Sequence, residues 1–411
     1  MTSTSTTRAA RRSFYALLGS SFFAITGNAF TTLAIPLYVL ATTGSAAKTG
    51  IIAFANTAPP IASALLGGPL IDRFGRRRSV LTSDMLSMIT LALIPILDRQ
   101  GVLSFPLLMA IVAMGAFFDP PGSSARQAML PTFATEAGYS PERAQSLFSV
   151  SFGLAQIIGP SLAGVSVAAI GASGTIWVNC VTFAVCLILI GGFVQRDSSG
   201  VMPSNSSFLE DLHSGWRYVW NDNFLRAMMV ISAAFSGVFV PIYTVLYPVF
   251  FTEVIKSQRT LGFFLGMEAA GGLIGAVLYG AIGQRFSRRN AMAFCLIAWL
   301  PSYWVLVFHP PIVWLLVAGF VAGLLTGPLQ PIFNVAFQVR TPDHMRARVF
   351  AMAMACTLIA VPIGSLILGP VIQAAGVIPT LVGLATVVTV LCIWCAFLPI
   401  LRELDHPLEP A

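Results

Sequence analysis

One carboxylic acid, Glu268, lies in the middle of an apolar segment that reads GFFLGMEAAGGLIGAVLYG. Gly272 and Gly275 follow at helical spacing, so the helix face that carries the acid is small and is expected to pack against protein or a cavity. A charge in the middle of a bilayer costs about 2.5 to 3.5 kcal/mol on insertion scales, and such groups usually have a function. Because a carboxyl group can take up and release a proton, Glu268 is the first candidate for proton coupling. The alternative is a neutral Glu that is hydrogen-bonded to a neighbouring helix.

Two further acids, Asp84 and Asp119, lie near the ends of apolar segments. Asp84 follows the basic stretch Arg76 to Arg78, and Asp119 precedes Arg126. Each acid could relay protons, or could pair with these arginines. We expect the pairing, as part of a network of charges at one end of the helices.

Uncharged polar residues are the candidates for a binding cavity. No arginine is expected within the fourth apolar segment, and no Lys or Arg in the core of any other, which disfavours phosphate and small organic acids as ligands. Thirty Phe and fourteen Met fit a broad apolar pocket for an amphipathic molecule. The polar candidates on inward helix faces are Asn28, Gln156, Tyr243 and Asn334.

The composition identifies the kind of protein that holds these residues. Of the 411 residues, 56% are hydrophobic and only 9% are charged, and the mean hydropathy is +0.82. These values lie far above those of a soluble domain, and a membrane-spanning helix needs roughly 20 apolar residues. We therefore predict an all-α membrane protein with twelve transmembrane helices, near 13–40, 49–72, 79–97, 102–124, 144–170, 173–194, 225–251, 260–285, 289–308, 312–337, 347–374 and 378–400.

The basic residues predict the orientation of the chain, because Lys and Arg near span ends favour the cytoplasmic side. With both termini in the cytoplasm, 19 of the 23 basic residues fall on that side; the others are Lys48, Arg99, Lys256 and Arg259. We predict a multi-pass protein of the plasma membrane, which the family resemblance described below implies to be a bacterial inner membrane. The net charge of +7 then reflects topology, and no nucleic-acid partner is expected.

A hydrophilic stretch interrupts the apolar segments and divides them six and six. We predict an N-terminal six-helix bundle at 1–194, a cytoplasmic linker at 195–224 and a C-terminal six-helix bundle at 225–411, the two bundles being related by pseudo-symmetry. Within the linker, Ser207 and Glu210 have the spacing of a helix N-cap, and apolar residues recur on one side after them. This pattern predicts an amphipathic helix on the inner membrane surface.

Two short stretches recur in the two halves of the chain. GPLIDRFGRRR at 68–78 is similar to GAIGQRFSRR at 280–289, at an offset of 212 residues. A second pair, 143–164 and 348–369, is offset by 205 residues. Both pairs occupy equivalent places in each set of six segments, which is typical of a duplicated transporter whose two bundles rock about a central site.

These motifs resemble those of the major facilitator superfamily over nearly the full length of the chain. The first stretch matches the family's signature for the loop between spans two and three, through Gly68, Asp72, Arg73, Gly75, Arg76 and Arg77. The fifth span resembles the family's antiporter motif, with Ala163 in place of one Gly, through Gly153, Gly159, Pro160 and Gly164. The stretches FFDPPGSSARQAMLP and MRARVF resemble the bacterial branch that includes macrolide-efflux proteins and siderophore exporters.

The resemblance implies a role for the loop charges. In the family, the acid at the position of Asp72 faces the N-terminal end of the eleventh span, which here begins near Arg346. The loop arginines, and Arg285 in the second repeat, would help to hold the cytoplasmic side closed as a latch. Gln284 stands where the second repeat would need an acid, so the latch is expected to be one-sided. The alternative is that these charges only anchor the loop in the cytoplasm.

We predict a secondary transporter that exports an amphipathic small molecule, such as a drug, an antibiotic or a siderophore, by alternating access in exchange for protons. The chain has no G-x-x-x-x-G-K-[ST] sequence, so direct pumping by nucleotide hydrolysis is unsupported. A nutrient-uptake symporter or facilitator is the alternative, and a receptor or scaffold without transport activity is the least favoured class. We expect no enzymatic activity, no metal site, no cofactor besides the proton gradient, and a functional monomer in the bilayer.

Overall fold

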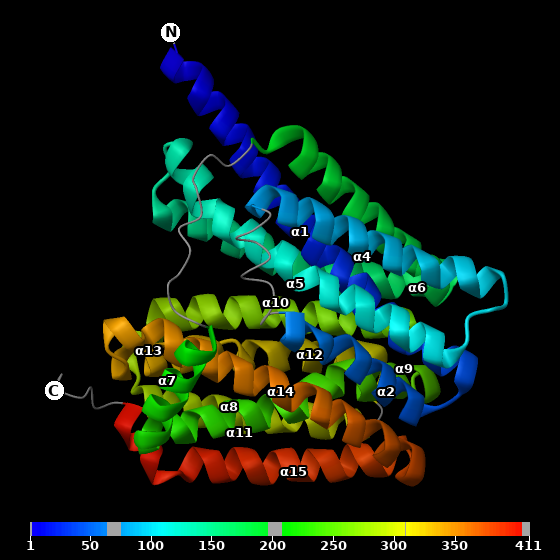
Figure 1. The fold of residues 1–411 in the computed structure, drawn as a ribbon. Helices are drawn as coiled ribbons and strands as arrows, with labels where there is room; N and C mark the ends of the chain where they lie inside the picture. Colours follow the sequence, from blue (N-terminus) through cyan, green and yellow to red (C-terminus); the bar gives the residue numbers. More distant parts are fainter. Residues whose placement is uncertain (1, 64–74, 196–207, 309, 405–411) are drawn as a thin grey trace. The chain divides into compact units, whose positions relative to one another are not determined.

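The computed structural model describes residues 2–63, 75–195, 208–308 and 310–404. The secondary-structure elements within these ranges are all helices (Figure 1). Ten of the helical segments in these ranges are long and apolar enough to cross a membrane. The predicted all-α membrane fold is therefore confirmed at this level.

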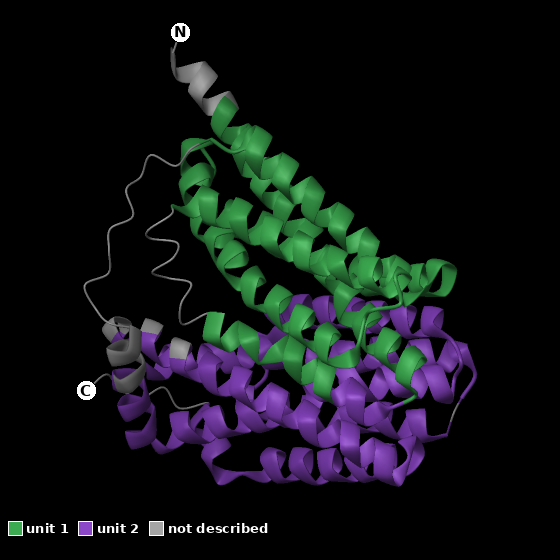
Figure 2. Ribbon diagram, turned by 45° about the vertical axis from the view of Figure 1, so that its right-hand side comes forward, with its two compact units in different colours: residues 1–44, 51–204 green, residues 45–50, 205–411 purple. Residues whose placement is uncertain are grey.

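The chain divides into two compact units, which Figure 2 colours separately. Unit 1 comprises residues 1–44 and 51–204, and unit 2 comprises residues 45–50 and 205–411. The short segment 45–50 belongs to unit 2 because it packs against a helix there: a Cβ at Gly50 would lie 2.6 Å from the carbonyl oxygen of Ser365.

Unit 1 is a bundle of long helices, which run side by side in Figure 1. They are α1 (Thr2–Thr43), most of α2 (Ala46–Thr57), α4 (Arg76–Arg99), α5 (Phe105–Glu136) and α6 (Pro141–Phe193). α6 covers both segments that we predicted at 144–170 and 173–194, and it contains a kink at Gly171, where φ is 76° and ψ is 169°. Glycine adopts this backbone conformation at little cost, so a sharp bend separates two apolar limbs.

Helices α1 and α6 pack closely because small residues lie at their contact. A Cβ at Gly159 would lie 2.8 Å from the Cβ of Ala29, and one at Gly27 would lie 2.0 Å from Oγ1 of Thr182. Nearby, Asn179 of α6 donates a hydrogen bond to the hydroxyl of Thr31 on α1. In a membrane, such close packing and buried hydrogen bonds replace the hydrophobic effect as the force between helices.

Unit 2 contains the remaining helices, beginning with the linker helix α7 (Phe208–Asn221). It continues through α8 (Asn223–Pro241), the π-helix η1 (Ile242–Leu246), α9 (Tyr247–Glu253), α10 (Gln258–Ile282), the 3-10 helix η2 (Gly283–Arg285) and α11 (Arg288–Val307). It ends with α12 (Ile312–Thr326), α13 (Leu329–Arg340), α14 (Asp343–Ala375), α15 (Val377–Phe397) and the 3-10 helix η3 (Pro399–Leu404). On α7, Trp216 and Trp220 stack at 4.6 Å between ring centroids and are 38% and 45% exposed, which suits the predicted contact with a membrane surface.

Arg340, at the end of α13, joins three segments of unit 2. Its Nε donates to Asp222 at 2.9 Å, and its Nη2 lies 2.9 Å from Glu403 of η3. Asp222 also accepts hydrogen bonds from the backbone N–H groups of Phe224 and Leu225, so it caps the N-terminus of α8. Arg340 of α13 therefore links η3, the last described element, to the start of α8.

Helices α10 and α12 approach each other backbone to backbone. A Cβ at Gly323 would lie 1.8 Å from the carbonyl oxygen of Glu268, and one at Gly271 would lie 2.0 Å from the carbonyl oxygen of Phe320. A Cβ at Gly275 would likewise lie 2.1 Å from the carbonyl oxygen of Leu324. The small face that the sequence predicts around Glu268 is therefore packed against α12.

Replacement of Gly323 by Ala is expected to destabilise unit 2, because the added methyl group has no room and rigid backbone surrounds it. We expect a loss of about 1 to 3 kcal/mol of stability, seen as a lower melting temperature of the purified protein in detergent. Gly280→Ala is the matched control, because no atom lies within 4 Å of its added Cβ. Equal melting temperatures for the two variants would contradict the close approach of α10 and α12.

Candidate substrate and coupling sites

Asp84 and Arg126 form an ion pair that is buried inside unit 1. Arg126 on α5 donates from Nη1 to both carboxylate oxygens of Asp84 on α4, at 2.7 and 2.8 Å. The two side chains are only 3% and 1% exposed. Of the arginines that we considered as partners for Asp84, the structure places Arg126 beside it. The pair joins α4 to α5, and its loss would leave one buried charge without compensation.

The expectation that the fourth span holds no arginine is wrong. We predicted that this span ends at residue 124, whereas α5 continues to Glu136 and Arg126 lies within it. When a single segment is considered, a charged residue is taken to mark the end of the span. Here the charge of Arg126 is compensated by Asp84 of a neighbouring helix. Arg126 lies two residues beyond the end that we predicted for this span, so the expectation that no Lys or Arg lies in the core of a span stays a prediction.

Asp119 also lies on α5, and its carboxyl group contacts α1. Asn28 of α1 donates from Nδ2 to Oδ2 of Asp119 at 3.1 Å. The other oxygen, Oδ1, is buried and has no hydrogen-bond partner within the described structure. A buried carboxylate oxygen without a donor is unusual, because burial of an unsatisfied polar atom is costly.

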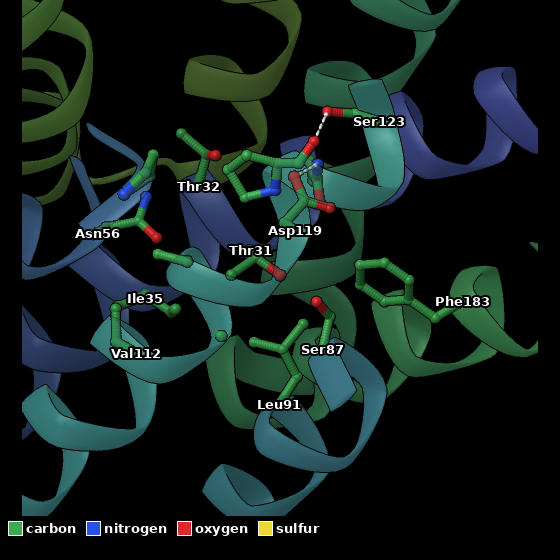
Figure 3. Close-up of a pocket in the computed structure, with 15 residues that line it drawn as sticks. Thr31, Thr32, Ile35, Asn56, Ser87, Leu91, Val112, Asp119, Ser123 and Phe183 are labelled. Carbon is green, nitrogen blue, oxygen red and sulfur yellow. Dashed lines mark hydrogen bonds between the residues drawn. The ribbon is translucent and has the colours of Figure 1, made fainter. Parts of the chain in front are cut away.

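The carboxyl group of Asp119 lies at a cavity of about 240 Å³ in unit 1 (Figure 3). Figure 3 shows Asp119, Ser87 and Thr31 around the same space, with Asn56 at its other side. Ser87 is 1% exposed, and its Oγ also has no partner among the described residues. Apolar side chains complete the wall, among them Leu91, Val112 and Phe183.

The structure distributes the four predicted cavity residues between the two units. Asn28 lines the cavity of unit 1. Gln156, on the same unit, is exposed on α6 and is not among the residues that line this cavity. Tyr243 and Asn334 belong to unit 2, where Asn334 accepts a hydrogen bond from Gln330 at 3.4 Å.

Glu268 lies buried in unit 2, where it is 6% exposed. Tyr243 donates its hydroxyl to Oε1 of Glu268, whereas Oε2 has no partner in the described part of the chain. Tyr243 belongs to the π-helix η1, which follows Pro241. A π-turn inside a membrane helix shifts the direction of its side chains and is common at functional sites.

Aromatic side chains surround this carboxyl group. The ring of Tyr247 lies 5.4 Å from that of Tyr243 and 5.3 Å from that of Phe264 on α10. On α11, Trp299 and Tyr303 form a further pair at 5.0 Å. The sequence analysis missed these aromatic residues, although Tyr243, Tyr247 and Phe251 recur at helical spacing and could have indicated a continuous face.

The predicted latch falls partly outside the structure. Gly68, Asp72 and Arg73 lie outside the described residues. Gly75, with φ of 81°, precedes Arg76 at the start of α4, a backbone conformation that favours glycine. Arg77 donates to the carbonyl oxygens of Val194 and Gly191 at 2.9 and 2.6 Å. This arginine therefore satisfies the last carbonyl groups of α6, as basic residues often do near helix C-termini.

The two latch arginines of unit 2 lie on different elements. Arg285 ends η2 and its side chain is exposed. Arg346, in the first turns of α14, donates from Nε to the carbonyl oxygens of Gln338 and Thr341, both at 3.2 Å. Arg346 thus joins α14 to the end of α13, and its part in a latch stays a prediction.

The antiporter-like motif lies on the first limb of α6. Gly159 and Gly164 are buried, whereas Gly153 and Pro160 are half-buried. The contact of Gly159 with Ala29 of α1 gives this glycine a packing role.

Comparison with protein families places the chain among transporters. The model of the Major Facilitator Superfamily matches residues 17–256 and 242–411. The chain belongs to this superfamily. It is therefore a transporter and not an enzyme, and a multi-pass protein of the inner membrane, as predicted.

Named relatives in the superfamily align with nearly the whole chain. The multidrug efflux pump Tap of Mycolicibacterium fortuitum is 33% identical over 96% of this chain and 97% of its own length. The staphyloferrin A transporter of Staphylococcus aureus (strain NCTC 8325 / PS 47) is 24% identical over 95% of this chain and 96% of its own length. Among solved structures, a variant of the nucleoside transporter NupG superposes with a TM-score of 0.79 at 12% identity, over 94% of this chain and 100% of that one. The predicted resemblance to the superfamily is confirmed.

Proposed function

We propose that this protein exports an amphipathic small molecule across the bacterial inner membrane by alternating access, in exchange for protons. The observation that carries export is the similarity to the multidrug efflux pump Tap over almost the full length of both chains. The similarity to the staphyloferrin A transporter extends the possible cargo to siderophore-like molecules. Glu268 supports proton coupling, because a buried carboxyl group with one free oxygen can hold or release a proton.

We further propose twelve spans with both termini in the cytoplasm, arranged as bundles 1–194 and 225–411 around the linker 195–224. Two features support this number beyond the ten apolar helices of the described residues. The kink at Gly171 divides α6 into two limbs, and α2 lies at the start of the second predicted span. The functional unit is a monomer, because such a bundle pair contains the whole transport path.

The test of export uses everted membrane vesicles whose lumen has been acidified by respiration. A macrolide, a lipophilic cation and a siderophore are added in turn, and a dye reports the lumenal pH. We expect at least one of them to make the lumen more alkaline, because substrate entering the lumen is exchanged for protons that leave it. No response to any of them, with the protein present in the membrane, would contradict proton-coupled export of these classes.

The latch is tested by Asp72→Asn, which removes the loop acid but keeps its size. We expect loss of transport with normal membrane insertion, because the closed cytoplasmic side would lose its charge contact with the start of the eleventh span. The measurement is the vesicle assay together with the amount of protein in the membrane. Gln284→Ala, at the equivalent place in the second repeat, is the control and should transport normally. Full activity of Asp72→Asn would leave these charges as topology anchors only.

A further inference from the structure

Among the described residues that line the cavity of unit 1, the one with a charged side chain is an acid, Asp119. Asp84 and Arg126, which form the buried ion pair of unit 1, are not among the residues that line this cavity. The Nη1 atom of Arg126 donates to both carboxylate oxygens of Asp84, at 2.7 and 2.8 Å. The guanidinium is thus paired with Asp84, and Oδ1 of Asp119 is left without a donor within the described structure. Such a buried oxygen calls for a cation or a strong donor from outside the protein.

Other side chains of the cavity carry oxygen atoms that can accept a hydrogen bond. Oγ of Ser87 has no hydrogen-bond partner among the described residues. Asn56, on α2, lines the same space and carries an amide oxygen. A primary ammonium group has three N–H donors, which matches a carboxylate, a hydroxyl and an amide oxygen around one small space.

The size of the cavity suits a head group rather than a complete drug. Its volume is about 240 Å³, whereas pockets for drug-sized ligands have roughly 300 to 1,000 Å³. Leu91, Val112 and Phe183 line the cavity beside the polar atoms and can contact the methylene groups that follow an amine. The apolar body of an amphipathic molecule would remain outside this space.

We propose that the cavity of unit 1 binds the protonated primary amine of the exported molecule, with Asp119 as its ion-pair partner. Asp119 then selects the cargo, a role different from both the proton relay and the pairing with arginine that the sequence analysis considered. This inference rests on the proposed export function, because it names a chemical class within the amphipathic cargo. Asn28 is a positioning residue, since its amide holds Oδ2 of Asp119 at 3.1 Å and leaves Oδ1 to the ligand.

The test compares two dyes that differ only in the amine. Monodansylcadaverine carries a primary amine at the end of an alkyl chain, and its N-acetyl derivative carries a neutral amide in its place. Each dye is titrated into the purified full-length protein in detergent, and the dansyl fluorescence reports binding. We expect the amine to bind about tenfold or more tightly than the amide, a difference of about 1.4 kcal/mol.

Variants connect the preference for the amine with the cavity. In Asp119→Asn, the two dyes should bind equally, because the ion pair is lost. Asn56→Leu is a second variant, which fills the cavity from α2 and changes no charge. It should weaken binding of the amine dye and leave binding of the amide dye nearly unchanged. Asp98→Asn is the control, because Asp98 is hydrogen-bonded by Tyr38 and does not line the cavity. Melting temperatures identify any variant that has lost its fold.

Three results would overturn the inference. One is equal binding of the two dyes by the unaltered protein, and another is a preference that survives in both Asp119→Asn and Asn56→Leu. The third is full displacement of the amine by sodium ions at constant ionic strength, which would assign the carboxylate to an inorganic cation. The binding test needs no proton gradient, so export in vesicles without an amine preference contradicts this inference alone, and an amine preference without export contradicts the proposed function alone.

Discussion

Replacement of Glu268 by Gln is expected to lower proton-coupled export by about tenfold or more, equivalent to about 1.4 kcal/mol or more in the transport barrier. Gln has nearly the same size as Glu, and its amide oxygen can still accept the hydrogen bond from Tyr243. The variant therefore keeps the packing of α10 against α12, but it cannot take up or release a proton. The measurement is substrate-dependent alkalinisation of the vesicle lumen, corrected for the amount of protein.

Two further variants separate coupling from structure at this site. Glu253→Gln makes the same chemical change at an exposed position of α9 and should leave export unchanged. Tyr243→Phe removes the donor to Oε1 while keeping the carboxyl group, so we expect a slower but still proton-coupled transporter. An unchanged rate in Glu268→Gln would remove this residue from the coupling route and leave it as a structural acid of α10.

Asp84→Leu and Arg126→Met are each expected to destabilise unit 1 by about 3 to 5 kcal/mol. Each variant leaves one member of the ion pair buried, where it has neither water nor its former partner. The double variant Asp84→Leu/Arg126→Met should recover most of this loss, because apolar side chains replace both charges. Thermal unfolding of the purified protein in detergent measures the stability of all three variants.

The comparison of single and double variants isolates the interaction between the two charges. Arg99→Gln is the control for the loss of an arginine, because Arg99 ends α4 with an exposed side chain and should cost no more than about 1 kcal/mol. If the effects of the single variants simply add in the double variant, the ion pair does not stabilise unit 1. If the double variant is stable but has lost transport, the pair serves the transport cycle as well as the fold.

Several features of the fold were predictable because they depend on local sequence. Long apolar segments must form helices in a bilayer, since every backbone polar group has to be satisfied within the segment. The predicted linker helix corresponds to α7, because its apolar residues recur at helical spacing. The loop signature and the fifth-span motif pointed to the superfamily, because their glycines and charges occur at a fixed spacing.

The candidate sites were only partly predictable, because their chemistry depends on residues far apart in the chain. Glu268 stood out as a lone acid in an apolar segment, but nothing in the local sequence indicated that Tyr243 would donate to it. Gln156 was a reasonable polar candidate, yet α6 places it on an exposed face. Helical periodicity predicts which residues share a face, but packing decides which face is inside.

The sequence by itself therefore determined the class of the protein and its apolar helices. It also identified the charged residues within apolar segments, whose burial in a membrane is costly and which are therefore expected to have a role. The tertiary structure decided which charges compensate one another. When its segment is considered alone, Arg126 lies beyond the predicted end of the span. In the structure it is a buried residue of α5, and its Nη1 atom lies 2.7 Å from Oδ1 of Asp84. The physical reason is that hydropathy is a property of a segment, whereas the cost of a buried charge depends on the partner that another helix supplies.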